Sequence, residues 1–300
     1  MSKREGGKDS SGRRGSPGKW ATRRHQLPRA DAGRPVGRRE TSSAPVGNLV
    51  IGRNAVRELL RHAPQRVVKA FIARAKDAAS SPIENELHEL LEVTEAVPSI
   101  APFDQLTRMA GSDSHQGWVI EVTARPQTEL KELLATLESA PESLLVLLDA
   151  VEDPHNVGSI MRAAECFGAD AVIFSRNRGA RITPSVTKAS AGATELVPIT
   201  EVSNLHDAIE KCRRAGWWII GAEAREGSRD LSTYEFGKKV ALVVGAEGQG
   251  MHDLTRKSLD EAVFIPMRGK IDSLNVGQAA AVLMAAYRGA AGGRRAPAKA

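Results

Sequence analysis

The chain has 300 residues, 41% of them hydrophobic and 26% charged, which is enough for two globular domains with ordinary cores. It contains no run of about 18 apolar residues and no apolar N-terminal signal core, which argues against a membrane protein or a secreted one. The two cysteines, Cys166 and Cys212, lie in apolar helical patterns, so we expect reduced packing residues in a cytoplasmic protein and neither a disulfide nor a metal site.

The positive charge is concentrated at the N-terminus. The formal net charge is +6, but residues 1–46 hold 12 Lys and Arg against 4 Asp and Glu, which leaves 30 basic and 32 acidic residues elsewhere. Residues 1–47 are also rich in Gly, Ser, Pro and Arg and show no periodicity, so we expect a disordered tail. Such a tail attracts nucleic acid without reading its sequence; a merely solubilising arm is the alternative.

Residues 48–124 have the pattern of a small α/β domain. Short apolar runs alternate with segments whose apolar residues recur at helical spacing. The expected strands are 49–51, 67–73 and 118–122, and the expected helices are 53–62, 83–91 and 103–109. The polar stretch 125–143, with two prolines and a helical middle, is interpreted as an interdomain linker.

From Leu144 onward, strands and helices alternate. Residues 144–148 form a continuous apolar run, which is typical of a strand buried on both faces. The pattern predicts a parallel sheet covered by helices on both sides over residues 144–289, followed by a flexible tail at 290–300. The expected strands are 144–148, 171–174, 217–221, 240–244 and 262–265, and the expected helices are 160–167, 205–215 and 276–287.

Three polar clusters each follow one of these strands, where open α/β sheets bind ligands. In the first, residues 149–162, Pro154 and Gly158 predict a tight strand-to-helix connection. Asn156 lies near the helix start and Arg162 about two turns further on. A helix cap followed by a surface arginine is the purely structural interpretation of this pair.

The second cluster is the glycine loop at residues 244–250. Glycines after a buried strand let a ligand approach the backbone closely, although a plain turn would need them equally. The spacing fits neither the dinucleotide fingerprint nor a phosphate loop. Glu247 is the sharper clue, because an acid among glycines can orient an arginine or balance a cationic ligand such as a sulfonium.

The third cluster, residues 265–278, follows the last expected strand. Ser273 or Asn275 can cap the final helix. Capping does not account for both residues, nor for Leu274 between them, which we expect to be buried.

Taken in order, the three clusters resemble the SpoU, or TrmH-like, family of RNA ribose methyltransferases in the SPOUT class. This resemblance covers residues 144–289. Residues 48–121, with the turn His115-Gln116-Gly117, resemble the substrate-binding domain that some members carry. That second resemblance favours the branch that acts on large-subunit ribosomal RNA.

The resemblance implies a C-terminal trefoil knot in the parallel sheet and a homodimer with the last helix partly in its interface; packing of that helix in the chain's own core is the alternative. It also implies S-adenosylmethionine as methyl donor, bound in the knot without a metal. The backbone at Gly245, Ile265 and Leu274 would contact the donor. The residues that match the family's polar active-site positions are Asn156, Arg162, Glu247, Ser273 and Asn275. Gly277-Gln278 departs from many relatives at the first turn of the knot helix.

The implied activity is methylation of a ribose 2′-hydroxyl, of a guanosine in ribosomal RNA by preference. Three alternatives stay open. The substrate could be transfer RNA, the methylated group could be a base in place of the ribose, or the chain could be a non-catalytic RNA-binding ribosome-assembly factor. A Rossmann oxidoreductase is the weakest alternative, because the glycine fingerprint and the ribose-binding acid are missing from the sequence.

Arg162 is the family's suggested activator of the hydroxyl, but arginine stays protonated in proteins, so literal base catalysis is hard to accept. We hypothesise that Arg162 clamps an RNA phosphate and stabilises the forming alkoxide, while the phosphate or a water takes the proton. Glu247 and Asn156 would hold the guanidinium. Ser273 and Asn275 would place the ribose and the donor loop.

Replacing Arg162 with lysine tests this hypothesis. Lysine keeps the charge but loses the planar fork that binds a phosphate through two N–H groups. We therefore expect Arg162→Lys to lose most of its turnover in a methyl-transfer assay. Turnover close to that of the wild type would count against the bidentate role.

Overall fold

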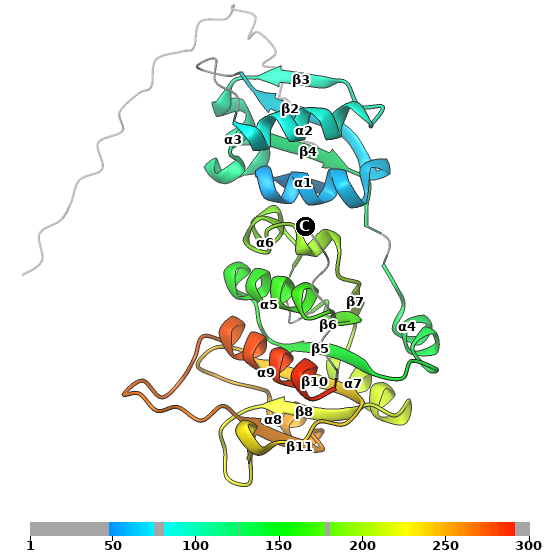
Figure 1. Cartoon of the computed structure of the whole chain (residues 1–300), viewed down its shortest axis with the longest axis vertical. Coiled ribbons are helices and arrows are strands. Elements are labelled where there is room, and N and C mark those ends of the chain that lie inside the picture. Colours follow the sequence, from blue (N-terminus) through cyan, green and yellow to red (C-terminus); the bar gives the residue numbers. More distant parts are fainter. Residues whose placement is uncertain (1–47, 75–80, 126, 178–180, 292–300) are drawn as a thin grey trace, which may run out of the picture. The chain divides into compact units, whose positions relative to one another are not determined.

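The computed structural model describes residues 48–74, 81–125, 127–177 and 181–291 (Figure 1). The expected basic tail at 1–47 and most of the expected tail at 290–300 lie outside the described residues. The described part contains two sheets, one formed by residues 48–122 and the other by residues 143–264.

The first sheet has four strands in the order β1-β4-β2-β3. Central β4 is antiparallel to β1 and β2, and β2 is parallel to β3. Helices α1 and α2 pack on one face and α3 on the other, because alternate strand residues point to opposite sides. The elements are β1 (Asn48–Ile51), α1 (Arg53–His62), β2 (Val67–Ala73), α2 (Pro82–Glu92), β3 (Pro98–Ala101), α3 (Phe103–Ala110) and β4 (Trp118–Val122).

The turn before β4 is built around the fully buried His115. Its Nδ1 accepts a hydrogen bond from the amide of Gly117 at 3.1 Å, so Nε2 carries the ring proton and faces Thr107 Oγ1 at 3.0 Å. The ring also lies against Phe103, with 4.2 Å between centroids. Burial lowers the pKa of His115, which keeps the imidazole neutral and able to accept.

The second sheet has seven strands, all paired in parallel, in the order β7-β6-β5-β10-β8-β11-β9. Central β5 is buried along its whole length, as its continuous apolar sequence predicts. The strands are β5 (Ser143–Asp149), β6 (Ala171–Ser175), β7 (Ile199–Val202), β8 (Trp218–Ala222), β9 (Arg229–Asp230), β10 (Lys239–Gly245) and β11 (Glu261–Phe264).

Helices cover both faces of this sheet. On one face, α5 (Pro154–Cys166) and α9 (Val276–Ala291) pack side by side, with α6 (Pro184–Ala189) beside α5 (Figure 1). On the other face, α4 (Leu130–Thr136) and α7 (Leu205–Arg214) share a second apolar core. The short α8 (Asp253–Lys257) leads into β11 and contacts α7. The predicted parallel sheet with two covered faces is therefore confirmed.

Several features differ from the sequence interpretation. Helix α5 begins at Pro154, two residues before Asn156, near which its start was predicted. The short elements β3, β7, β9, α6 and α8, none longer than six residues, were not predicted. The middle of the expected linker is α4, whose three leucines are buried in the core of the second sheet. Helix α9 continues two residues beyond residue 289.

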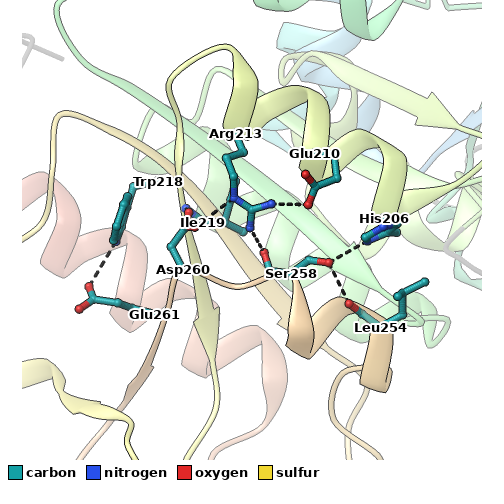
Figure 2. A network of polar contacts seen from close by, with 9 residues as sticks. All are labelled: His206, Glu210, Arg213, Trp218, Ile219, Leu254, Ser258, Asp260 and Glu261. Carbon is teal, nitrogen blue, oxygen red and sulfur yellow. Dashed lines mark hydrogen bonds and ion pairs between the residues drawn. The ribbon is translucent and has the colours of Figure 1, made fainter.

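A polar network fixes α7 and α8 to the amino ends of β8 and β11 (Figure 2). Asp260 accepts from Arg213 Nε at 3.0 Å and from the amide of Ile219 at 2.8 Å. Arg213 also donates to Glu210 and to the carbonyl of Ser258. One carboxylate therefore holds a helix, a strand and a connecting turn together. Among the described residues, no helix is long and apolar enough to cross a membrane.

The buried imidazole makes the stability of the first sheet depend on pH. The folded state has the lower His115 pKa, so its contribution is complete above the unfolded value of about 6.5 and is lost as the pH falls below it. His115→Leu leaves the buried Gly117 amide without its acceptor, which should cost about 1–3 kcal/mol at pH 7.5 and less at pH 5.5. Thermal unfolding at both pH values checks this. His62→Gln, at an exposed position on α1, is the control; an equal loss for His115→Leu at both pH values would contradict the assignment.

Candidate active site

A cavity of about 540 Å³ lies at the carboxyl ends of β8 and β10. Three separate stretches line it: the residues after β8, the glycine loop after β10, and the segment that enters α9. The lining residues are Ala222, Ala224, Val244, Gly245, Ala246, Glu247, Gly248, Gly250, Asp272, Ser273, Leu274, Asn275, Val276 and Ala279. This is the edge of a parallel sheet at which open α/β folds bind ligands.

The glycine loop is a closed hairpin. The amide of Ala246 donates to the carbonyl of Gly250 at 3.0 Å, and the amide of Gly250 donates back to Ala246 at 2.8 Å. We call the place where Gly245 and Ala246 lie against Gly250 the neck of the loop. A Cβ atom on Gly245 would lie 2.4 Å from the carbonyl carbon of Gly250, so no side chain fits there. The glycine found by sequence is therefore required for loop closure itself. The closed hairpin presents Glu247 near its tip.

Three of the predicted polar residues meet beside this cavity. Asn275 Nδ2 lies 2.6 Å from Asn156 Oδ1 and 3.3 Å from Glu247 Oε2. Asn156 Nδ2 donates in turn to Glu247 Oε2 at 3.0 Å. These residues come one from each of the three clusters, so the structure brings the clusters together at one point. Among the described residues, the side-chain partners of Glu247 are neutral amides, which leaves a net negative charge at the cavity.

The ends of α5 and α9 explain why these side chains are available. Asp153 caps α5, since its Oδ1 accepts from the amides of His155 at 3.0 Å and Asn156 at 2.9 Å. The cap that the sequence suggested for Asn156 is therefore made by Asp153. The side-chain amide of Asn156 is left free for the site. The Asp-Pro pair that begins α5 was the missed signal, since aspartate is a good cap and proline suits the first helical position.

The cap of α9 falls on Asn275. Its Oδ1 accepts from the amide of Gly277 at 2.8 Å while its Nδ2 makes the site contacts, so this residue has both roles. Ser273 is exposed, and its hydroxyl lies 3.3 Å from Asp272 Oδ1. Ser273 lines the cavity but is not hydrogen-bonded to the three meeting residues in the described part of the chain.

Arg162 does not join this cluster. It is exposed on α5, and no hydrogen bond or ion pair of its side chain occurs among the described residues. Six residues separate it from Asn156; at about 100° per residue it points well away from that side chain. The expected grip of Glu247 and Asn156 on the guanidinium is thus absent here, and their side chains bond each other instead.

Two of the three residues predicted to contact the donor line the cavity. Gly245 and Leu274 line the cavity, whereas Ile265 is half-buried and packs against the core that α5 and α9 share. Leu274 is 36% exposed, so the expectation of burial was wrong. The reason is its position in the exposed loop that enters α9, where no neighbouring layer covers it.

Gly277, which departs from the pattern of many relatives, is required by the packing of α9 on α5. A Cβ atom there would lie 2.6 Å from Ser159 Cβ on α5 and 3.2 Å from Asn275 Oδ1. Glycine therefore lets the first turn of α9 approach α5 closely. That approach brings Asn275 within hydrogen-bond distance of Asn156.

Two family models match the chain. Residues 143–285 match the SpoU rRNA methylase family. Residues 49–128 match the substrate-binding domain of RNA 2′-O ribose methyltransferases. The two matches cover the second and the first sheet respectively.

Curated relatives match over most of their length. The chain is 38% identical over 241 residues to the 23S rRNA (guanosine-2′-O-)-methyltransferase RlmB of Ralstonia nicotianae, covering 79% of this chain and 93% of that protein. It is 34% identical over 239 residues to YacO of Bacillus subtilis, a putative TrmH family tRNA/rRNA methyltransferase, covering 78% and 92%.

A solved structure shares the fold. The SpoU methyltransferase AviRb from Streptomyces viridochromogenes, crystallised in complex with the cofactor AdoMet, superimposes with a TM-score of 0.66 at 24% identity. The alignment covers 82% of this chain and 91% of that protein.

The neck of the glycine loop can be tested directly. In Gly245→Ala, the added methyl group meets backbone atoms, so we expect a loss of about 1–3 kcal/mol in the free energy of unfolding. Gly237→Ala is the matched control, because nothing lies within 4 Å of its added Cβ. Denaturant unfolding of the two variants measures the difference. Equal stability of both would show that the neck is looser than described.

Proposed function

The chain belongs to the SpoU rRNA methylase family, and from this premise we propose that it transfers a methyl group from S-adenosylmethionine to the 2′-hydroxyl of a guanosine ribose in 23S ribosomal RNA. The meeting of Asn156, Glu247 and Asn275 beside the cavity is the observation that carries this proposal. The relatives named for this activity and the match to a ribose-methyltransferase substrate-binding domain support the choice of RNA and of ribose.

The cavity suits the proposed donor. Its volume lies within the range of about 300–1,000 Å³ found for small-molecule sites, and much of its wall is glycine-rich backbone that a ligand can approach closely. When bound, S-adenosylmethionine supplies an electrophilic methyl group on a positively charged sulfur. Glu247 provides a negative charge at that wall, which favours a cationic ligand over a neutral one.

The two asparagines hold fixed orientations. Because Asn275 Oδ1 accepts from Gly277, its Nδ2 must face Asn156, whose own Oδ1 accepts and whose Nδ2 then donates to Glu247. Each amide thus determines the orientation of the next. Such a preset array can place a ribose without reorganising during the reaction. Ser273, exposed at the cavity wall, adds a hydroxyl for the ribose or the donor loop.

Arg162 supplies positive charge from the outer surface of α5. A permanently protonated guanidinium binds a phosphate through two N–H groups and stabilises a forming alkoxide, so the proton of the ribose hydroxyl goes to the phosphate or to a water. Its exposure leaves it free to take up RNA. Contact with Glu247 and Asn156 would require the guanidinium to move when RNA binds.

The remaining features of the proposal concern assembly and organisation. We place residues 48–124 as the RNA-binding domain, 125–143 as a linker whose helix α4 packs on the second sheet, and 144–289 as the methyltransferase domain with a C-terminal trefoil knot. The enzyme acts in the cytoplasm as a homodimer through α9.

Purified protein with labelled donor provides the test. Unmodified 23S rRNA should accept methyl groups while transfer RNA does not, and nucleoside analysis should yield 2′-O-methylguanosine. Mapping 2′-O-methyl sites in RNA from cells with and without the gene then identifies the nucleotide. A methylated base, or donor binding without transfer to any cellular RNA, would favour one of the alternatives over this proposal.

Asn275→Ala should lower kcat by about 100-fold, the loss typical of removing one preorganised polar group from an active site. Because Asn275 also caps α9, the matched control is Asn204→Ala, which removes the asparagine that caps α7 by accepting from the amide of His206. Both variants should lose similar stability, about 1 kcal/mol, but only the first should lose turnover. A similar fall in kcat for both would mean that Asn275 acts through helix stability alone.

A further inference from the structure

The exit of the glycine loop is tied to the neighbouring strand by one carboxylate. Asp149, the last residue of β5, accepts from the amide of His252 at 2.7 Å through Oδ2 and from His252 Nδ1 at 2.8 Å through Oδ1. Asp149 is also the register partner of Gly245, where the loop begins. The loop therefore leaves β10 beside Asp149 and, after its hairpin, is held by the side chain of that same residue.

This carboxylate belongs to the loop rather than to the core. Asp149 is only 5% exposed, and within the described part of the chain both hydrogen-bond partners of its carboxylate are atoms of His252. An ionised carboxylate accepts only, so His252 Nδ1 carries the proton. A buried carboxylate is costly without such partners. The His252 side chain is 48% exposed, so its ring can be removed without leaving a void in the core.

The loop has other restraints. Its neck is closed by the two backbone bonds between Ala246 and Gly250, and Glu247, inside the hairpin, is bonded to the two asparagines. Met251, after the neck, is 3% exposed in the second apolar core. Arg256 Nη2 lies 3.5 Å from the carbonyl of Gln249, which is a long contact. The bonds from Asp149 are the short, charge-assisted ones that hold the segment after the neck.

We propose that Asp149 and His252 form a positioning pair that holds the glycine loop in its donor-binding shape before the donor arrives. This rests on the proposed function, because it assumes that the cavity takes S-adenosylmethionine. A preformed loop spares the donor the cost of ordering it. Neither residue lines the cavity, so the pair acts on donor affinity and leaves the chemical step to the residues that do.

We expect variants of the pair to differ in their Kd for S-adenosylmethionine in a definite order. Asp149→Ala removes both bonds; if the loop is then competent about one-tenth of the time, the Kd for S-adenosylmethionine rises about 10-fold. His252→Ala keeps the backbone bond and should weaken binding by a few-fold. The double variant should match Asp149→Ala, because His252 acts through Asp149. Asp149→Asn should recover most of the affinity, since the imidazole can change tautomer and accept from the new amide.

The matched control is Asp260→Ala in the network of Figure 2. Asp260, like Asp149, accepts from one backbone amide and one side-chain nitrogen, but it lies at the opposite ends of the strands. Asp260→Ala should lower the melting temperature without changing the Kd for S-adenosylmethionine. This separates loop positioning from general stability.

Three measurements make the test. Calorimetric titration with S-adenosylmethionine, without RNA, gives Kd. Hydrogen exchange of residues 246–252 in the donor-free protein should be faster in Asp149→Ala than in the wild type and unchanged in Asp260→Ala. Steady-state assays should show a raised donor KM with kcat at saturation within about three-fold of the wild type.

The outcomes separate the two proposals. A wild-type Kd and wild-type exchange in folded Asp149→Ala would overturn the positioning role and leave the proposed function standing. Should Asp149→Ala fail to fold, an unchanged Kd in His252→Ala would overturn the role equally. A wild-type chain that neither binds the donor nor methylates RNA would overturn the proposed function and this inference together.

Discussion

The hydrogen-bond chain from Gly277 through Asn275 and Asn156 to Glu247 is the interaction on which the candidate site depends. It is built from two neutral amides and one acid, and each link fixes the orientation of the next. Because its members belong to α5, the glycine loop and the entrance of α9, it exists only when these three pieces are assembled. The cavity beside it therefore forms with the fold and not before it.

The sheet and two glycines make this assembly feasible. Parallel strands bring the carboxyl ends of β5, β8 and β10 to one edge, so the loops that follow them are neighbours whatever their distance along the chain. Gly245 then allows the hairpin to close on itself, and Gly277 allows α9 to approach α5. A methyl group at either position would meet atoms of the neighbouring segment.

Charge is divided across the site in a way that matches methyl transfer. The acid Glu247 has amide partners and stands at the cavity, where a cationic donor is favoured. The cation Arg162 is exposed on the outer surface of α5, where a polyanion can reach it. In the proposed reaction, the acid would face the cationic donor and the arginine the polyanionic RNA. The charge of Asp149 likewise takes no part in the proposed chemistry, because its carboxylate is bonded to His252 at the exit of the loop.

The sequence alone predicted a parallel sheet covered on both faces, the helix at 53–62 and strand at 67–73 to the residue, and the three clusters that carry the family resemblance. Those features are written in local periodicity and in residue types at fixed spacing. The tertiary structure decided which hydrogen bonds join Asn156, Glu247 and Asn275, that Leu274 is exposed and that His252 meets Asp149. Hydrogen-bond partners and burial of this kind depend on residues far away in the chain, which no local pattern specifies.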